Sequence, residues 1–128
     1  MVTDPISDLV IRLKNGSAAG KPTVEILASK FAENVAQALK KAGYISAVSK
    51  NAKKFTIELG LVYFSGEPRV HGVERISKPS RRMYVKASDL RTFKSGFGNA
   101  FLSTPKGIMS DAEAKKHKTG GEILFRIW

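Results

Sequence analysis

The sequence predicts an α+β protein made of two small α/β lobes packed together. Apolar residues recur at helical spacing in the first part of the chain, the second half is mostly strand-like, and Gly66-Glu67-Pro68 separates the two patterns. A chain of 128 residues with 42% hydrophobic side chains suits one compact domain or two small lobes that share an interface. We therefore expect an N-terminal lobe over residues 1–65, a linker over 66–72 and a C-terminal lobe over 73–128.

The N-terminal lobe is predicted to begin with a helix, a strand and a second helix. Asp4-Pro5 is typical of an N-cap followed by a proline at the first helical position, and Asn15-Gly16 is expected to end this helix. Three of the four residues 23–26 are β-branched, which predicts a brief strand. Ser29 is placed to cap the second helix, and Gly43 to stop it. The apolar stripe of this helix is expected at Phe31, Val35, Ala38, Leu39 and Ala42.

A hairpin is predicted to complete this lobe. Residues 44–48 and 55–59 are the expected strands, and the second of them alternates as a half-buried strand should. Residues 50–54 form a basic turn between them.

The C-terminal lobe is predicted to be mostly β, with one short helix. Residues 88–90 indicate a single helical turn, and residues 94–98 a loop. Ser110-Asp111-Ala112-Glu113 is a capping box, and the basic run over residues 115–118 suits the end of the helix that it opens. The expected strands are residues 73–77, 82–86, 100–103 and 122–128, with turns at 78–81 and 104–107 and with Gly120-Gly121 leading into the last strand.

The charge balance points to a polyanionic partner. The chain holds 22 Lys and Arg against 11 Asp and Glu, a net charge of +11. Residues 1–66 hold 9 basic and 5 acidic side chains, a net +4, and residues 67–128 hold 13 and 6, a net +7. The second half is therefore the stronger candidate for nucleic-acid binding.

Several other classes are disfavoured. The chain has no cysteine, which excludes disulfides and thiolate metal sites. Its two histidines, His71 and His117, are far apart in sequence, and no hydrolase or phosphate-loop motif is present. No apolar run is long enough to span a bilayer. We therefore expect no enzymatic activity, no cofactor, no metal and no membrane partner. The lack of cysteine is compatible with a cytoplasmic location.

The turn Ser103-Thr104-Pro105-Lys106-Gly107 carries chemistry suited to RNA. Hydroxyl groups both donate and accept hydrogen bonds, the Lys106 ammonium suits a phosphate, and Gly107 permits close backbone approach. Lys78, Arg81 and Arg82 add cations, and Tyr84 is available to stack on a base. Taken alone, such a segment is as often a plain turn.

Five segments in the same order resemble the family of small-subunit ribosomal protein S eight, bacterial type. They are the N-terminal run over residues 3–16, the helix end Lys41-Ala42-Gly43-Tyr44-Ile45, residues 75–84, the signature over residues 102–111, and Gly120-Gly121-Glu122-Ile123-Leu124. The resemblance covers essentially the whole chain. It implies direct binding to a helix in the central domain of small-subunit rRNA, nucleation of that domain's assembly, contacts with neighbouring ribosomal proteins, and translational control through its own messenger RNA.

The resemblance also implies the residues that contact RNA. In the C-terminal lobe they are Ser103, Thr104, Lys106 and Gly107, supported by Glu122 and flanked by Tyr84, Lys78, Arg81 and Arg82; in the N-terminal lobe they are Thr3, Asp4, Arg12, Asn15 and Lys30. One position departs from the family pattern. The chain has Pro105 where the family usually has a second serine, so a hydroxyl and an N–H are lost while the turn becomes stiffer.

Three other readings fit the charge. A general nucleic-acid chaperone or a DNA-binding protein would have the same basic charge without needing the turn over residues 103–107 for recognition. An RNA-modifying or hydrolytic enzyme would depend on His71 or His117. A protein that binds acidic partner proteins would form complexes without RNA.

Overall fold

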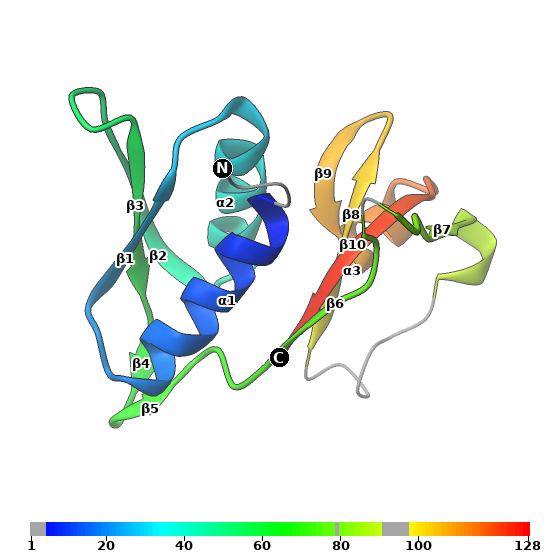
Figure 1. The fold of residues 1–128 in the computed structure, drawn as a ribbon. Helices are drawn as coiled ribbons and strands as arrows, with labels where there is room; N and C mark the ends of the chain where they lie inside the picture. The colour runs from blue at the N-terminus through cyan, green and yellow to red at the C-terminus, as the bar shows by residue number, and fades with distance from the viewer. Residues whose placement is uncertain (1–4, 79, 91–97) are drawn as a thin grey trace. The chain divides into compact units, whose positions relative to one another are not determined.

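The structure is a computed structural model that describes residues 5–78, 80–90 and 98–128. It contains helices and antiparallel sheets, which confirms the predicted α+β class. The chain folds into two compact units, Met1–Gly72 and Val73–Trp128 (Figure 1).

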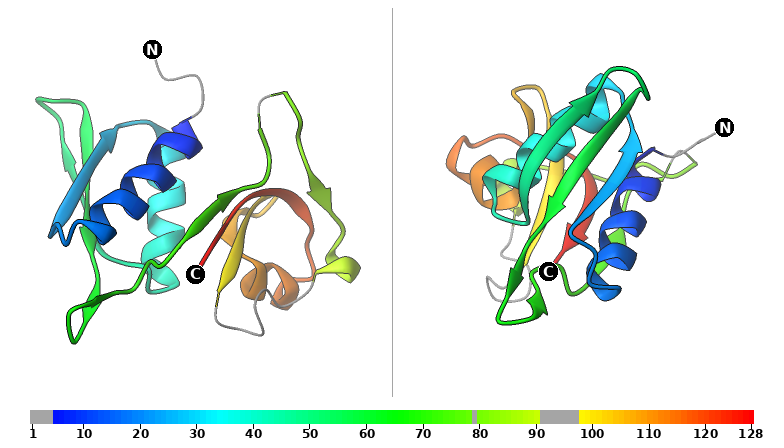
Figure 2. Two further views of the ribbon diagram at one scale, coloured as in Figure 1. Left: turned by 60° about the horizontal axis from the view of Figure 1, so that its bottom comes forward. Right: turned by 90° about the vertical axis from the view of Figure 1, so that its left-hand side faces the viewer.

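The first unit places two helices on one face of a three-stranded sheet (Figures 1 and 2). Its largest fully buried side chains include Leu13 of α1, Leu39 of α2, Leu59 of β3, and Tyr44, which follows α2. The sheet order is β1-β3-β2, and β4 and β5 form a separate small hairpin. The elements are α1 (Pro5–Ala18), β1 (Thr23–Leu27), α2 (Lys30–Lys41), β2 (Ile45–Asn51), β3 (Thr56–Leu61), β4 (Tyr63–Phe64) and β5 (Glu67–Pro68).

Two predictions for these helices are wrong. Helix α1 does not end at Gly16 but continues to Ala18. Gly16 is buried, and a Cβ there would meet Val24 Cγ1 at 2.5 Å, so this glycine lets β1 approach the helix. The stripe of α2 is also rotated, because Ala32 and Ala36 are buried whereas Phe31 is exposed. The expected cap is confirmed, since the Ser29 hydroxyl accepts a hydrogen bond from the Ala32 N–H at 3.0 Å.

The second unit is built on the last strand of the chain. The sheet order is β6-β10-β8-β9, and β7 also pairs with β10. Phe101 and Phe125 are fully buried and stack with their ring centroids 5.3 Å apart. The elements are β6 (Val73–Arg75), β7 (Tyr84–Val85), the 3₁₀ turn η1 (Ala87–Asp89), β8 (Asn99–Thr104), β9 (Gly107–Ser110), α3 (Asp111–Lys116) and β10 (Gly121–Ile127).

The structure corrects three details of this unit. Residues 73–77 and 82–86 are not a strand pair of their own, because β6 and β7 both pair with β10 along the same edge. Strand β9 was not predicted, and neither was the irregular register between Ile123 and Phe125 on β10. The capping box is confirmed at Ser110, whose hydroxyl accepts from the Glu113 N–H at 3.3 Å. The loop predicted over residues 94–98 lies outside the described residues except at Gly98.

Candidate nucleic-acid interface

Three of the predicted RNA-contacting residues form a row across the second sheet. Glu122 of β10 is paired with Ser103 of β8 on one side and with Tyr84 of β7 on the other. Residues directly opposite each other in antiparallel strands share a face, and their Cβ atoms lie about 4.5–5.5 Å apart. Leu102 and Ile123, the next pair along, belong to the core beneath α3, so the row lies on the opposite face. We call Ser103, Glu122 and Tyr84 the polar row.

The polar row combines three kinds of chemistry. The Tyr84 side chain is 69% exposed, so its ring face is available for stacking. The Glu122 side chain is only 14% exposed. The Ser103 hydroxyl is half-buried and makes no hydrogen bond to any other residue that the structure describes. It is therefore free to donate and accept at the same time.

Two glycines that sequence reasoning did not assign to the site hold the row together. A Cβ on Gly121 would lie 3.1 Å from Thr104 Cα and closer still to the Ser103 carbonyl group. A Cβ on Gly120 would meet the backbone at Val85 and Ala87. These are backbone atoms, which cannot move aside as the end of a flexible side chain can. The sequence placed Gly120-Gly121 only as the lead into the last strand, whereas in the structure the two glycines bring the start of β10 between two neighbouring segments.

The turn after Ser103 is closed by the Thr104 side chain. The Thr104 hydroxyl donates to the Gly107 carbonyl at 2.7 Å and accepts from the Lys106 N–H at 3.2 Å. Gly107 has a φ of +116°, which an L side chain rarely adopts. The Lys106 ammonium lies 3.3 Å from the carbonyl oxygen of His117, at the end of α3. The donating proton of Thr104 is thus used inside the turn, whereas Lys106 keeps further donors for a phosphate.

A basic loop lies beside the polar row, between β6 and β7. Lys78 and Arg81 close it through two backbone hydrogen bonds, of 2.8 and 2.9 Å. At its base, the hydroxyl of fully buried Ser77 accepts from the Met83 N–H at 2.9 Å and donates to the Met83 carbonyl at 3.2 Å. The Arg82 guanidinium lies 3.3 Å from the Glu122 carboxylate. Arg82 therefore connects the basic loop, residues 78–82, to the polar row.

Of the residues predicted to contact RNA in the first lobe, Arg12 is held by hydrogen bonds, whereas Asn15 and Lys30 are simply exposed. Arg12 of α1 is held by the Asp8 carboxylate at 3.0 Å and donates to the Glu25 carbonyl at 3.3 Å. Asn15 of α1 and Lys30, the first residue of α2, are both exposed. Thr3 and Asp4 lie outside the described residues.

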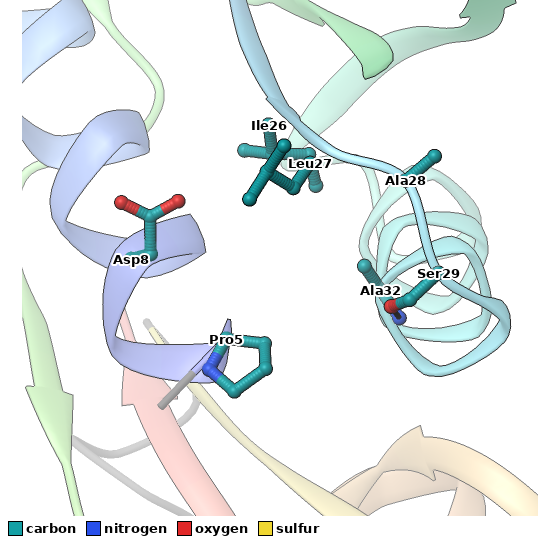
Figure 3. Close-up of a pocket in the computed structure, with 7 residues that line it drawn as sticks. All are labelled: Pro5, Asp8, Ile26, Leu27, Ala28, Ser29 and Ala32. Atoms are coloured by element: carbon teal, nitrogen blue, oxygen red, sulfur yellow. Dashed lines mark hydrogen bonds between the residues drawn. The ribbon is translucent and has the colours of Figure 1, made fainter. Parts of the chain in front are cut away.

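A pocket of about 330 Å³ opens between the first turns of α1 and α2 (Figure 3). Its lining is mainly apolar, and Asp8, the acidic residue among the lining residues, already pairs with Arg12. The lining residues are Pro5, Asp8, Ile26, Leu27, Ala28, Ser29 and Ala32. Ser29, the hydroxyl-bearing residue of the lining, accepts a hydrogen bond from the Ala32 N–H as the cap of α2.

Outside the interface, the relevant features of the described residues are the two histidines, candidate metal sites and candidate membrane-spanning helices. His71 and His117 are exposed, and the ring of His117 faces Glu113 at 3.8 Å. Among the described residues, no group of three or more His, Cys, Asp or Glu side chains could hold a metal ion. None of the helices in the described ranges is both long and apolar enough to cross a membrane.

Comparison with known proteins gives one consistent result. The family model "Ribosomal protein S8" matches residues 4–128. The chain is 43% identical to "Small ribosomal subunit protein uS8" of Persephonella marina over the whole of both chains. It is 42% identical to the protein of the same name from Nitrobacter winogradskyi, over 98% of this chain and 97% of that one. It is 41% identical to that of Erythrobacter litoralis, over 99% and 98%.

Proposed function

Because the chain belongs to the ribosomal protein S8 family, we propose that its second unit binds an irregular, unpaired feature of an rRNA helix in the central domain of the small subunit. The protein is a structural constituent of the small ribosomal subunit and not an enzyme. In this proposal, the protein holds the rRNA in shape through side chains of the second unit.

The observation that supports this proposal most strongly is the polar row. Register pairing puts a hydroxyl, a carboxylate and an aromatic ring side by side on one face of the sheet. The hydroxyl reads donors and acceptors, the carboxylate accepts from exposed amino groups, and the ring stacks on a base. Regular A-form RNA hides its bases in a deep, narrow groove, so a row of this kind needs bases that are unpaired or displaced.

Cations beside the row would hold the RNA backbone. Lys78, Arg81 and Arg82 of the basic loop and Lys106 of the turn are all exposed, and they lie on the two segments that border the row. We assign phosphate contacts to these four side chains. Thr104 and Gly107 support the site by shaping the turn.

The first unit would add weaker contacts. Exposed Arg12, Asn15 and Lys30, together with Thr3 and Asp4, are proposed to contact rRNA as well. Ribosomal RNA and other ribosomal proteins are the partners expected of a small-subunit protein. We also propose that early binding nucleates the central domain, and that a similar element in the protein's own messenger RNA gives translational control.

Substituting Ser103 tests the main site. Ser103→Ala should weaken binding to the rRNA helix that carries the unpaired feature by roughly 3- to 10-fold, the effect of one lost hydrogen bond, and leave binding to a regular duplex unchanged. Fluorescence anisotropy at fixed salt measures both affinities. Ser49→Ala, at an exposed position of β2, is the matched control. An unchanged affinity ratio between the two RNAs would remove the specific role given to Ser103.

Crosslinking in cells followed by sequencing tests the partner. One dominant peak in small-subunit rRNA is expected, with a second peak in the protein's own messenger RNA if translational control operates. Peaks scattered over many RNAs or over DNA would instead favour a general nucleic-acid chaperone.

A further inference from the structure

We propose that the loop joining β2 and β3 is a second RNA-contact surface, on which Phe55 stacks against an unpaired base while Lys53 and Lys54 hold the flanking phosphates. The loop belongs to the first unit, whereas the polar row and the basic loop belong to the second. It contains none of the residues assigned to RNA binding above. We call residues 52–55 the lysine-phenylalanine loop.

The lysine-phenylalanine loop is held in a defined shape. It sits at the free end of the β2–β3 hairpin, where Asn51 pairs with Thr56 (Figure 1). The Asn51 side-chain oxygen accepts from the N–H groups of Lys53 at 3.1 Å and of Lys54 at 3.2 Å. The Phe55 carbonyl accepts from the Ala28 N–H at 2.8 Å. One end of the loop is therefore held by Asn51 at the end of β2, and the other by Ala28, which follows β1. Hydrogen bonds of this kind lower the cost of ordering the loop when a partner binds.

Phe55 occupies a position that is unfavourable for phenylalanine on two grounds. Its φ is +53°, in the left-handed region that disfavours residues with a bulky side chain, and the residue is 74% exposed. Three non-glycine residues have positive φ in the described chain, and the other two, Ser65 and Lys118, are polar. Glycine would remove both the strain and the exposed apolar surface. Strained backbone positions cluster at functional sites, so an exposed aromatic residue at such a position favours a recognition role for Phe55.

The charge around the ring favours a polyanion. Lys50 is neutralised by Glu33, whose carboxylate lies 2.9 Å from the lysine ammonium. Lys53 and Lys54 are exposed and have no carboxylate partner within the part of the chain that the structure describes. The loop itself contains no acidic residue. An aromatic face next to two unpaired ammonium groups matches a nucleobase next to its phosphates, because stacking uses the ring and the phosphates use the cations.

A titration of the full-length protein tests the proposal. The probe is the single-stranded oligonucleotide U₈, and the readout is the backbone amide resonances of ¹⁵N-labelled protein. The amides of residues 53–56 are expected to shift, separately from those of Ser103, Thr104, Lys106 and Gly107, so the two surfaces are observed independently in one experiment. Loss of one stacked base should make Phe55→Gly bind at the hairpin roughly 5- to 100-fold more weakly. Phe55→Tyr should bind as the wild type does.

The controls keep the outcome interpretable. Phe55→Gly relieves a left-handed φ, so its melting temperature should be no lower than that of the wild type. Replacing Lys53 and Lys54 together by alanine should reduce the salt dependence of binding at the hairpin. Hairpin amides that do not respond to U₈, or an equal response in Phe55→Gly, would overturn the proposal. Neither result would change the role given to Ser103, which is tested with a different RNA and by fluorescence anisotropy.

Discussion

Replacing Gly121 by alanine should damage the fold and the RNA site together. Gly121 is the first residue of β10, where it pairs with Val85 of β7 and lies against the backbone of Ser103 and Thr104. An added Cβ would lie 3.0 Å from the Ser103 carbonyl carbon and 3.1 Å from Thr104 Cα, with the carbonyl oxygen nearer still. Ordinary contacts begin at 3.4 Å, so the strands must separate by at least 0.4 Å (3.4 − 3.0), and by more to clear the oxygen.

The expected cost follows from that separation. Forcing one extra methyl group into a closely packed place costs about 1–3 kcal/mol. Lengthening one or two ladder hydrogen bonds beside the row adds about 1 kcal/mol for each. We therefore expect Gly121→Ala to lower the free energy of unfolding by about 2–5 kcal/mol, which for a chain of this size lowers the melting temperature by roughly 7–19 °C.

Urea unfolding followed by circular dichroism measures the change. The control is Gly20→Ala, where a Cβ meets nothing within 4 Å but φ is +73°, so only the conformational cost of about 1–2 kcal/mol is expected. Affinity for the unpaired rRNA feature should also fall in Gly121→Ala, because Ser103 moves relative to Glu122. If Gly121→Ala were no less stable than Gly20→Ala, the close backbone approach would not be what positions the row.

Two further predictions concern hydroxyl groups that act inside the protein. Ser77→Ala leaves the Met83 N–H without its hydrogen-bond partner, so it should lower the free energy of unfolding by about 1–3 kcal/mol, measured by urea unfolding. It should also flatten the salt dependence of RNA binding, measured by salt titration. Ser80→Ala, at an exposed position of the same loop, should change neither quantity. Thr104→Val should destabilise the free protein by about 1 kcal/mol in urea unfolding, because the Thr104 hydroxyl makes two hydrogen bonds within the turn. Ser103→Ala should leave the unfolding midpoint unchanged. Equal midpoints for the two variants would mean that the Thr104 hydroxyl does not hold the turn.

Much of the fold was predictable because its signals are local. The Ser29 and Ser110 caps follow from the sequence, since a cap depends on residues only three positions apart. The errors arose where a partner distant in the sequence decides the outcome. Gly16 has the pattern of a helix end, but it is buried where α1 meets Val24 of β1. Phe31 has the spacing of a core residue, but Ala32 and Ala36 are buried instead.

In the candidate site, too, the local features were predictable from the sequence, whereas the pairing of distant residues was not. Its residue types, its charge and the turn over residues 103–107 were visible in the sequence, and so was the resemblance that gave Tyr84 and Glu122 a role. No periodicity could place Tyr84 opposite Glu122, which is 38 positions away (122 − 84). The exposed Phe55 was also missed, because alternation alone assigned it to a strand, whereas its φ of +53° places it in the loop.

The sequence by itself determined that this protein is basic, mixed in secondary structure and equipped for RNA, because composition, caps and turns depend on each residue and its near neighbours. Only the tertiary structure decided which side chains work together. The register of β10 between β7 and β8 assembles the polar row, Gly120 and Gly121 permit that approach, and Ser77 holds the basic loop beside it. Strand register depends on burial summed over the whole sheet, so it is a property of the folded chain rather than of any segment.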